Sequence, residues 1–246
     1  MGFSWISIPY CTGDVHLGAL THTFDLAKRN FQGRSNSALI AARALATWAS
    51  PTHLVVTGES AGGFGAAGSY DFLRSVWGGV AGLKGLLMDD SGPILDDTAI
   101  APCLQEKWRG IWNINASLPS GCPCVSNGGN IVSVWNYTMA KWPSDSFALI
   151  STLQDSVVSL FFSYGDLDCH SILPVGYTKL EAGLKRLAAG GVPSYLIDGS
   201  EHTHTGSKAE FYTKQSEGVY LYKWIAQLLG SGPDPPSVVP SVSARK

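Results

Sequence analysis

Residues 52–65, THLVVTGESAGGFG, decide the fold. The first half, THLVVT, is a short β-branched apolar run that is typical of a buried parallel strand. The second half contains Gly58-Glu59-Ser60-Ala61-Gly62, which matches the pattern G-x-S-x-G, and a helix-like segment follows it to about Trp77. A buried strand, a tight turn and a helix in direct succession project the serine side chain from the edge of a sheet. We therefore predict that Ser60 is a nucleophile.

The residues around Ser60 fit this chemistry. We expect the glycines to be needed because the tight turn leaves no room for a Cβ beside the serine. The N-terminus of the following helix would place the Ala61 N–H where a developing oxyanion sits. The alternative is a glycine-rich strand-to-helix turn that binds a phosphate or nothing.

Strand-like and helix-like segments alternate along the rest of the chain. Helices of ten or more residues between strands predict a mostly parallel sheet, and such sheets place their sites at the carboxyl ends of the strands. Strands are expected at 3–9, 52–57, 83–88, 147–153 and 193–197, and helices at 37–49, 64–77, 177–189 and 218–229.

The chain is expected to form a single catalytic domain over residues 1–230. Residues 95–145 hold several tryptophans and three cysteines, and we interpret them as an irregular insertion that caps the sheet. The tail from 231 to 246 is rich in proline and serine and is expected to be disordered.

A serine nucleophile needs a histidine base, and the base needs an orienting acid. Where the chain order is serine, acid, histidine, as in α/β-hydrolases, the base must follow Ser60. His170, His202 and His204 do so. We favour His202 because it lies just past the last expected strand. His204, two residues on, is its rival, and His170 lies in an expected loop.

Five aspartates are candidates for the acid. Asp155 ends the strand that precedes the last helix–strand unit, which is the expected place for the acid. Asp89 and Asp90 also end a strand but come early in the chain. The full set of candidates is Asp89, Asp90, Asp155, Asp166 and Asp168.

Two segments resemble the pectin acetylesterase and Notum carboxylesterase family. Residues 8–18, IPYCTGDVHLG, are similar to its PYC-(S/T)-x-D-V segment, and residues 58–65, GESAGGFG, are similar to its nucleophile segment. The similarity runs from Trp5 to about Trp224 and is looser after Pro93. It implies an α/β-hydrolase-like three-layer sandwich with a mostly parallel sheet.

Carried over by position, the resemblance implies a triad of Ser60, Asp155 and His202, with Ala61 as the oxyanion donor. The implied activity is removal of O-acetyl groups from polysaccharides such as pectin, through an acyl-enzyme on Ser60. It implies no cofactor and no catalytic metal, and the implied partner is an acetylated polysaccharide or another acyl ester.

Other functions remain open at this stage. Deacylation of a lipidated protein, as by Notum, would need a deep apolar pocket. A non-catalytic homologue that only binds glycans is a second alternative, and a serine peptidase shares the triad chemistry although the resemblance argues against it. Trp135 and Trp142 would line a sugar or acyl groove or simply pack, and the roles of Asp14 and His16 are undecided.

The sequence departs from the family pattern at its start. The family's second oxyanion donor lies in a Gly-Gly-rich segment upstream of the PYC strand, and this sequence begins at that strand. We therefore expect the fold to be N-terminally truncated, with no signal peptide in the given sequence.

Composition narrows the class of protein. The chain has 246 residues, of which 45% are hydrophobic and 15% are charged, and a net charge of −2. It lacks the basic surplus that phosphate backbones require, so nucleic acid is not an expected partner. No apolar run is long enough to span a membrane.

The cysteines and two sequons favour export from the cell. Cys103, Cys122 and Cys124 suggest a loop braced by disulfides, which form in oxidising compartments. Structural zinc is the less favoured alternative, because the spacing does not give two CxxC pairs. The sequons at 115–117 and 136–138 agree with a secreted protein, and the odd number of cysteines leaves at least one without an internal partner.

Overall fold

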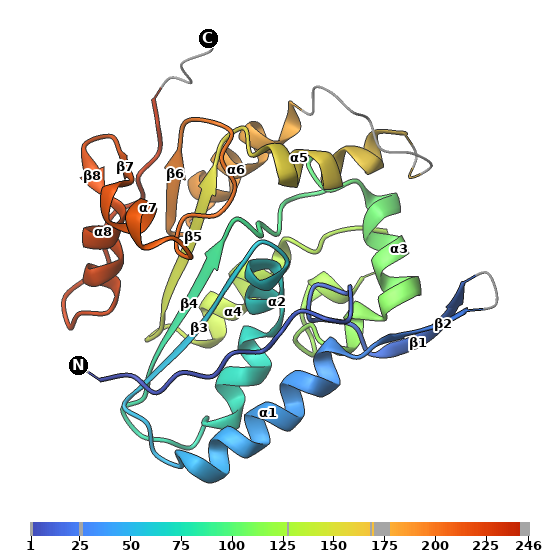
Figure 1. Ribbon diagram of the computed structural model, residues 1–246, viewed down its shortest axis with the longest axis horizontal. Coiled ribbons are helices and arrows are strands. Elements are labelled where there is room, and N and C mark those ends of the chain that lie inside the picture. The colour runs from blue at the N-terminus through green and yellow to red at the C-terminus, as the bar shows by residue number, and fades with distance from the viewer. Residues whose placement is uncertain (1, 25–26, 127, 168, 170–177, 242–246) are drawn as a thin grey trace.

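A four-stranded parallel sheet forms the centre of the molecule (Figure 1). The computed structural model describes residues 2–24, 27–126, 128–167, 169 and 178–241. The sheet order is β3-β4-β5-β6, so neighbouring strands follow one another in the sequence. The strands are β3 (His53–Glu59), β4 (Lys84–Asp90), β5 (Ser146–Thr152) and β6 (Ser194–Ile197).

The carboxyl ends of these strands are aligned at one edge. Glu59 pairs with Asp90, Asp90 pairs with Ile150, and Thr152 pairs with Ile197. The segments that follow β3, β5 and β6 therefore leave the sheet at the same edge. These segments carry the predicted serine, acid and histidine.

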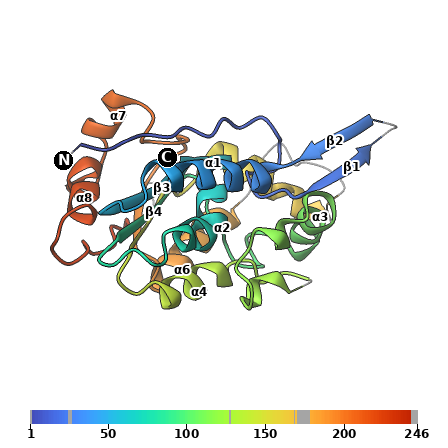
Figure 2. The same ribbon diagram turned by 90° about the horizontal axis from the view of Figure 1, so that it is seen from below.

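Alternating side chains of the strands face two different layers of helices. On one face Leu87 and Leu149 pack with Phe64 of α2 and Leu184 of α6 in the larger core cluster. On the other face Leu86, Ala148 and Ile150 pack with Trp224 of α8. The helices are α2 (Ala61–Val76), α6 (Lys179–Ala189) and α8 (Leu221–Leu228). Figure 2 shows α8 on one side of β3 and β4, with α2, α4 and α6 on the other.

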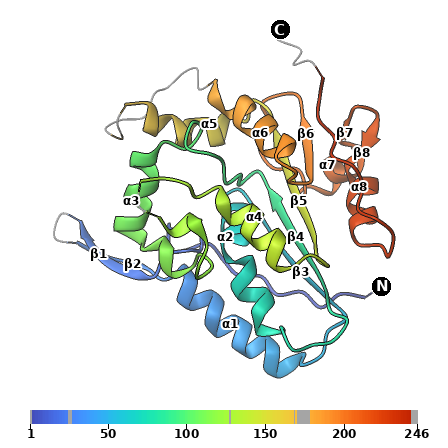
Figure 3. The ribbon, with the colours of Figure 1, turned by 180° about the vertical axis from the view of Figure 1, so that it is seen from behind.

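The remaining elements surround this sandwich. Helix α1 packs along α2, and α4 lies on the same side of the sheet as α2 (Figure 3). Their bounds are β1 (Leu20–Phe24), β2 (Ala27–Phe31), α1 (Gly33–Thr47), α3 (Pro102–Trp112), η1 (Ile114–Ala116), η2 (Pro123–Val125), α4 (Ser133–Lys141), α5 (Ser156–Ser163), η3 (Tyr164–Leu167), α7 (Lys208–Thr213), β7 (Gln215–Ser216) and β8 (Val219–Tyr220). None of the described helices is long and apolar enough to cross a lipid bilayer.

The predicted α/β sandwich is confirmed, but three local predictions are wrong. Residues 3–9 are not a strand, because they lie on the surface, where Trp5 is 77% exposed, and pair with no described strand. The last helix begins only at Leu221, after the hairpin of β7 and β8. The insertion is not irregular throughout, because 95–145 contains α3 and α4.

The tail is ordered where the structure describes it. Val238 forms a parallel bridge with Tyr195 of β6. Its N–H donates to the Ser194 carbonyl, and its carbonyl accepts the Leu196 N–H. Trp224 donates its indole N–H to Pro236 O, at 2.9 Å. The prediction of disorder is therefore wrong for this part of 231–246, because the segment covers the outer edge of β6.

The cysteines of the described chain form two disulfides. Cys103 bonds Cys169, and Cys122 bonds Cys124, while Cys11 is free and exposed. The alternative of structural zinc at these thiols is wrong, since disulfide sulfurs are not thiolate ligands. No group of three or more His, Cys, Asp or Glu side chains suited to a metal occurs within the part of the chain described here.

Candidate functional site

Ser60 stands at the turn between β3 and α2. It has a φ of 57° and a ψ of −121°, a left-handed backbone conformation that non-glycine residues rarely adopt. Its N–H donates to the backbone oxygen of Asp90 at 2.7 Å, and its own carbonyl accepts the Phe64 N–H. Strain of this kind persists only where the surroundings hold it, and it clusters at functional sites.

The two glycines of the G-x-S-x-G match are not equivalent. A Cβ on Gly58 would lie 2.3 Å from the backbone carbon and oxygen of Gly62, whereas a Cβ on Gly62 would meet no atom within 4 Å. The expectation that the turn excludes a Cβ therefore holds at Gly58 and is wrong at Gly62.

This difference gives a matched pair of variants. Gly58→Ala is expected to lower the free energy of unfolding by about 2–3 kcal/mol, because backbone would have to move to admit the methyl group. Gly62→Ala, in the first turn of α2, is expected to be neutral or to raise that free energy by up to about 1 kcal/mol. Urea denaturation of both variants measures the effect. Equal losses would contradict the crowding at Gly58.

The first turn of α2 offers backbone donors beside Ser60. Ala61 is the first residue of α2, and the Phe64 N–H is the donor that bonds back to the Ser60 carbonyl. The N–H groups of the first turn have no acceptor inside a helix, and the helix dipole adds positive potential there. The Ala61 N–H therefore has the place that the sequence predicts for an oxyanion donor, and that role stays a prediction.

Asp155 and His202 lie together. His202 Nδ1 is 2.7 Å from Asp155 Oδ2, and the Asp155 carboxylate is fully buried while the His202 side chain is 19% exposed. The other carboxylate oxygen accepts the N–H groups of Val157 and Val158 at 2.9 Å, so Asp155 also caps α5. A carboxylate at Nδ1 leaves Nε2 of the ring to act as the base.

The link between serine and histidine is open in this structure. Neither the Ser60 hydroxyl nor His202 Nε2 makes a hydrogen bond with the other. The two segments are nonetheless adjacent, because the Thr205 hydroxyl oxygen lies 3.1 Å from Glu59 Oε1. Hydrogen bonds of this kind are often long without substrate and tighten when it binds.

The competing aspartates have other surroundings. Burial raises the pKa of Asp89 well above its usual range, the charge of Asp90 raises it further, and one oxygen accepts the Gly92 N–H at 2.9 Å. Asp89 is buried against Gly63 of α2. Asp90 accepts hydrogen bonds from the segment that follows His202. Asp168, His170 and the Asp166 side chain lie outside what the structure describes.

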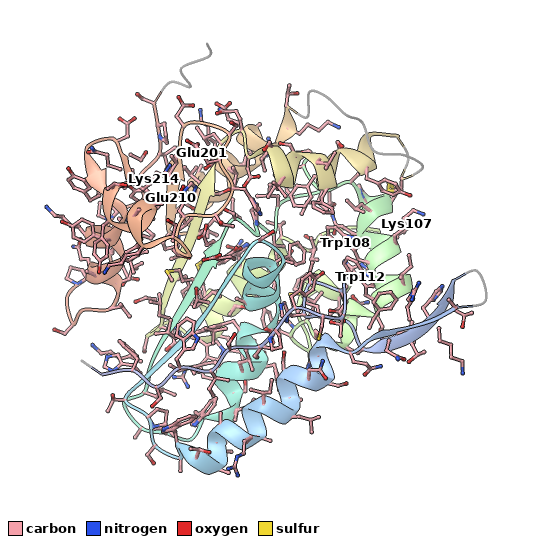
Figure 4. All side chains as sticks on the ribbon, in the orientation of Figure 1. Lys107, Trp108, Trp112, Glu201, Glu210 and Lys214 are labelled. Carbon is pink, nitrogen blue, oxygen red and sulfur yellow. A yellow bond between two sulfur atoms is a disulfide. The ribbon has the colours of Figure 1, made fainter. Side chains whose placement is uncertain are left out.

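His204, the rival base, is enclosed. It is fully buried, and Nε2 lies 2.8 Å from the Thr152 hydroxyl, while Nδ1 is buried without a partner. Burial lowers its pKa; the charge of Asp90 opposes this, and Lys214 lowers it further. The carboxylates of Glu210 and Glu201 also oppose the shift, and Figure 4 shows them beside Lys214. An imidazole that is enclosed in this way is not positioned to act on an ester.

The lowered pKa of His204 predicts how stability depends on pH. His204 has a lower pKa in the folded state than in the unfolded chain. Between these two pKa values the unfolded chain binds more protons than the folded one, so the folded state loses stability as the pH falls. The loss should begin below about pH 6.5, where an unfolded histidine protonates. His204→Gln should flatten this part of the curve, measured by urea denaturation at a series of pH values. If the free energy of unfolding fell with pH equally in His204→Gln and wild type, the role of His204 in this pH dependence would be contradicted.

Several other sequence candidates have structural roles. Trp135 is buried and donates to Ile94 O, and Trp142 donates to Asp71 and stacks under Arg74, so these indoles pack rather than line a groove. Two other indoles, those of Trp108 and Trp112 on α3 (Figure 4), are half-buried and stack with their ring centroids 5.9 Å apart. Trp108 also meets the ring of Phe64 edge-on.

Asp14 and His16 belong to the loop that runs beside α2. Asp14 is fully buried and accepts hydrogen bonds from the Thr12 hydroxyl and from the N–H groups of His16 and Gly33. It therefore ties this loop to the start of α1. His16 packs against Gly65, one turn after Ser60, and burial lowers its pKa.

The chain has an α/β-hydrolase-like fold, in which a parallel sheet lies between two layers of helices. The segments that carry Ser60, Asp155 and His202 meet at the carboxyl edge of this sheet. The fold is similar to a solved structure of the Wnt deacylase Notum from Drosophila, with a TM-score of 0.72 and 16% sequence identity. The match covers 96% of this chain and 70% of that chain. No protein-family model matches the chain. No curated protein matches it either.

Proposed function

We propose that the protein hydrolyses carboxylic esters through an acyl-enzyme on Ser60. The observation that carries the proposal is the 2.7 Å contact between Asp155 and His202, at the sheet edge where Ser60 adopts its left-handed conformation. The likeness in fold to the Wnt deacylase Notum supports hydrolysis of an acyl ester.

The reaction runs in two steps. His202 Nε2 takes the proton from Ser60 Oγ as that oxygen attacks the ester carbonyl, and Asp155 stabilises the imidazolium that forms. The Ala61 N–H stabilises the oxyanion. The protonated His202 then gives its proton to the departing alcohol, and a water molecule, deprotonated by His202, cleaves the acyl-enzyme and restores Ser60.

We place the acyl group among the short ones, with O-acetylated polysaccharides such as pectin as the substrate class. Two surface hollows, of about 180 and 400 Å³, are lined by other parts of the chain, such as Lys84 and Asp145 for the first and Glu106 and Arg109 for the second. Ser60 lines neither hollow, and an acetyl group needs little enclosure. The two disulfides favour an exported protein.

Removal of a lipid from a protein is the second candidate, because a solved structure with a similar fold is that of a Wnt deacylase. Release of acetate from acetylated pectin, compared with hydrolysis of p-nitrophenyl acetate and p-nitrophenyl octanoate, separates the two. The proposal expects acetate release and a preference for the short ester. A preference for octanoate would favour the deacylase, and glycan binding without hydrolysis would replace both by a non-catalytic role.

A further inference from the structure

The two aspartates that end β4 point to opposite faces of the sheet. Side chains alternate along a strand, so consecutive residues face different layers. Asp89 faces α2, where a Cβ on Gly63 would lie 2.2 Å from its carboxylate. Asp90 faces the other way, toward the segment that follows His202.

Asp90 is fully buried and is held by four hydrogen bonds from neutral donors. Its Oδ2 accepts the N–H of His204, the N–H of Thr205 and the hydroxyl of Thr205, each at 2.8 Å. Its Oδ1 accepts the Ser91 hydroxyl at 2.9 Å, and the oxygen of that hydroxyl accepts the Thr203 N–H at 3.2 Å. Asp90 therefore binds His204 and Thr205 directly and Thr203 through Ser91.

The backbone of Asp90 reaches the other half of the site. Its carbonyl oxygen accepts the Ser60 N–H at 2.7 Å, which is one of the bonds that hold the serine turn. A single residue thus bonds the turn that carries Ser60 and the segment that begins beside His202. Hydrogen bonds to a buried carboxylate are stronger than those between neutral groups, so this connection is stiff.

We infer that Asp90 is a positioning residue that fixes His202 relative to Ser60. This inference rests on the proposed function, because it assigns Asp90 a role in the same reaction. Asp90 touches neither the ester nor the proton in transit. It acts on the distance between Ser60 Oγ and His202 Nε2, to which the rate of proton transfer is sensitive.

Asp90→Asn is the variant that tests the inference with the least damage to the fold. An asparagine can turn its oxygen to the three donors of residues 204–205 and its amide toward Ser91, so the shape is kept while the charge is lost. We expect kcat for p-nitrophenyl acetate and the rate of Ser60 labelling by a fluorophosphonate to fall roughly ten- to a hundredfold. The KM should change less than about twofold, because no contact to the ester is removed.

Asp145→Asn is the matched control. Asp145 is also a buried carboxylate, but it directly precedes β5 at the opposite edge of the sheet, where it accepts hydrogen bonds from Tyr70, Arg74 and Gly85. It should lower stability and leave kcat of the folded protein unchanged. Amide hydrogen exchange of the peptide that spans 202–205 adds a readout independent of activity, and it should rise in Asp90→Asn and not in Asp145→Asn.

The outcomes separate the two proposals. Wild-type kcat and labelling in Asp90→Asn would overturn the inference and leave the proposed function intact. Equal loss of kcat in both variants would also overturn it, because the effect would then be general destabilisation. An unreactive wild-type protein would overturn the proposed function. If the wild-type protein were unreactive, amide hydrogen exchange would still test the link between Asp90 and residues 202–205. Unchanged exchange of this peptide in Asp90→Asn would overturn that link as well.

Discussion

Replacing Ser60 with alanine should lower the rate of ester hydrolysis by roughly four to six orders of magnitude. The methyl group of alanine cannot form the acyl-enzyme, so only hydrolysis by a bound water near the first turn of α2 remains. The measurement is the rate of p-nitrophenol release from p-nitrophenyl acetate by purified protein at matched concentration. Unfolding in urea should show little change, because the Ser60 side chain makes no capping hydrogen bond to the described residues of α2.

Ser75→Ala is the control for this variant. Ser75 lies near the other end of the same helix, α2, and bonds only the Asp71 carbonyl through its hydroxyl. Its replacement should leave hydrolysis within about twofold of wild type. If Ser60→Ala kept more than about a tenth of the activity, the acyl-enzyme mechanism would be wrong for this protein.

Replacing Asp155 with asparagine should lower kcat by about four orders of magnitude. Asparagine can keep its oxygen on the N–H groups of Val157 and Val158, as the native carboxylate does. The amide nitrogen then faces His202 Nδ1 and forces that atom to accept a hydrogen bond, which moves the ring proton to Nε2. A ring protonated at Nε2 cannot take the proton of Ser60.

Asp155→Ala separates the two roles of this carboxylate. It removes the cap of α5 as well as the partner of His202, so the free energy of unfolding should fall by about 1–2 kcal/mol. Asp155→Asn should stay close to wild type in the same urea titration, since asparagine caps helices as well as aspartate does. High activity in Asp155→Asn would show that the pair with His202 only supports the loop.

The sequence predicted the central sheet because its strands are continuous apolar runs. The runs before Ser60, Asp155 and His202 became β3, β5 and β6 of one parallel sheet, with their carboxyl ends at one edge. The places of Asp155 and His202 just after two of these strands, together with the family resemblance, predicted that the two side chains pair. The 2.7 Å distance confirms their contact, while their catalytic roles remain predictions.

The segments that were predicted wrongly depend on contacts that a local pattern does not contain. Residues 3–9 have the apolar composition of a strand but find no neighbour to pair with. The proline-rich tail becomes ordered only because Val238 meets the free edge of β6. The hydrogen bonds that join Asp90 and Ser91 to residues 203–205 could not be predicted for a similar reason, because Thr203 and Thr205 belong to no motif.

The most direct test of the account is mass spectrometry of the folded protein after treatment with a fluorophosphonate, a reagent that only an activated serine attacks. The account predicts one covalent adduct, located on Ser60 by peptide mapping, that is absent in Ser60→Ala and strongly slowed in Asp155→Asn. A folded protein that forms no adduct, or forms it on another serine, would contradict the assignment of Ser60 as the nucleophile.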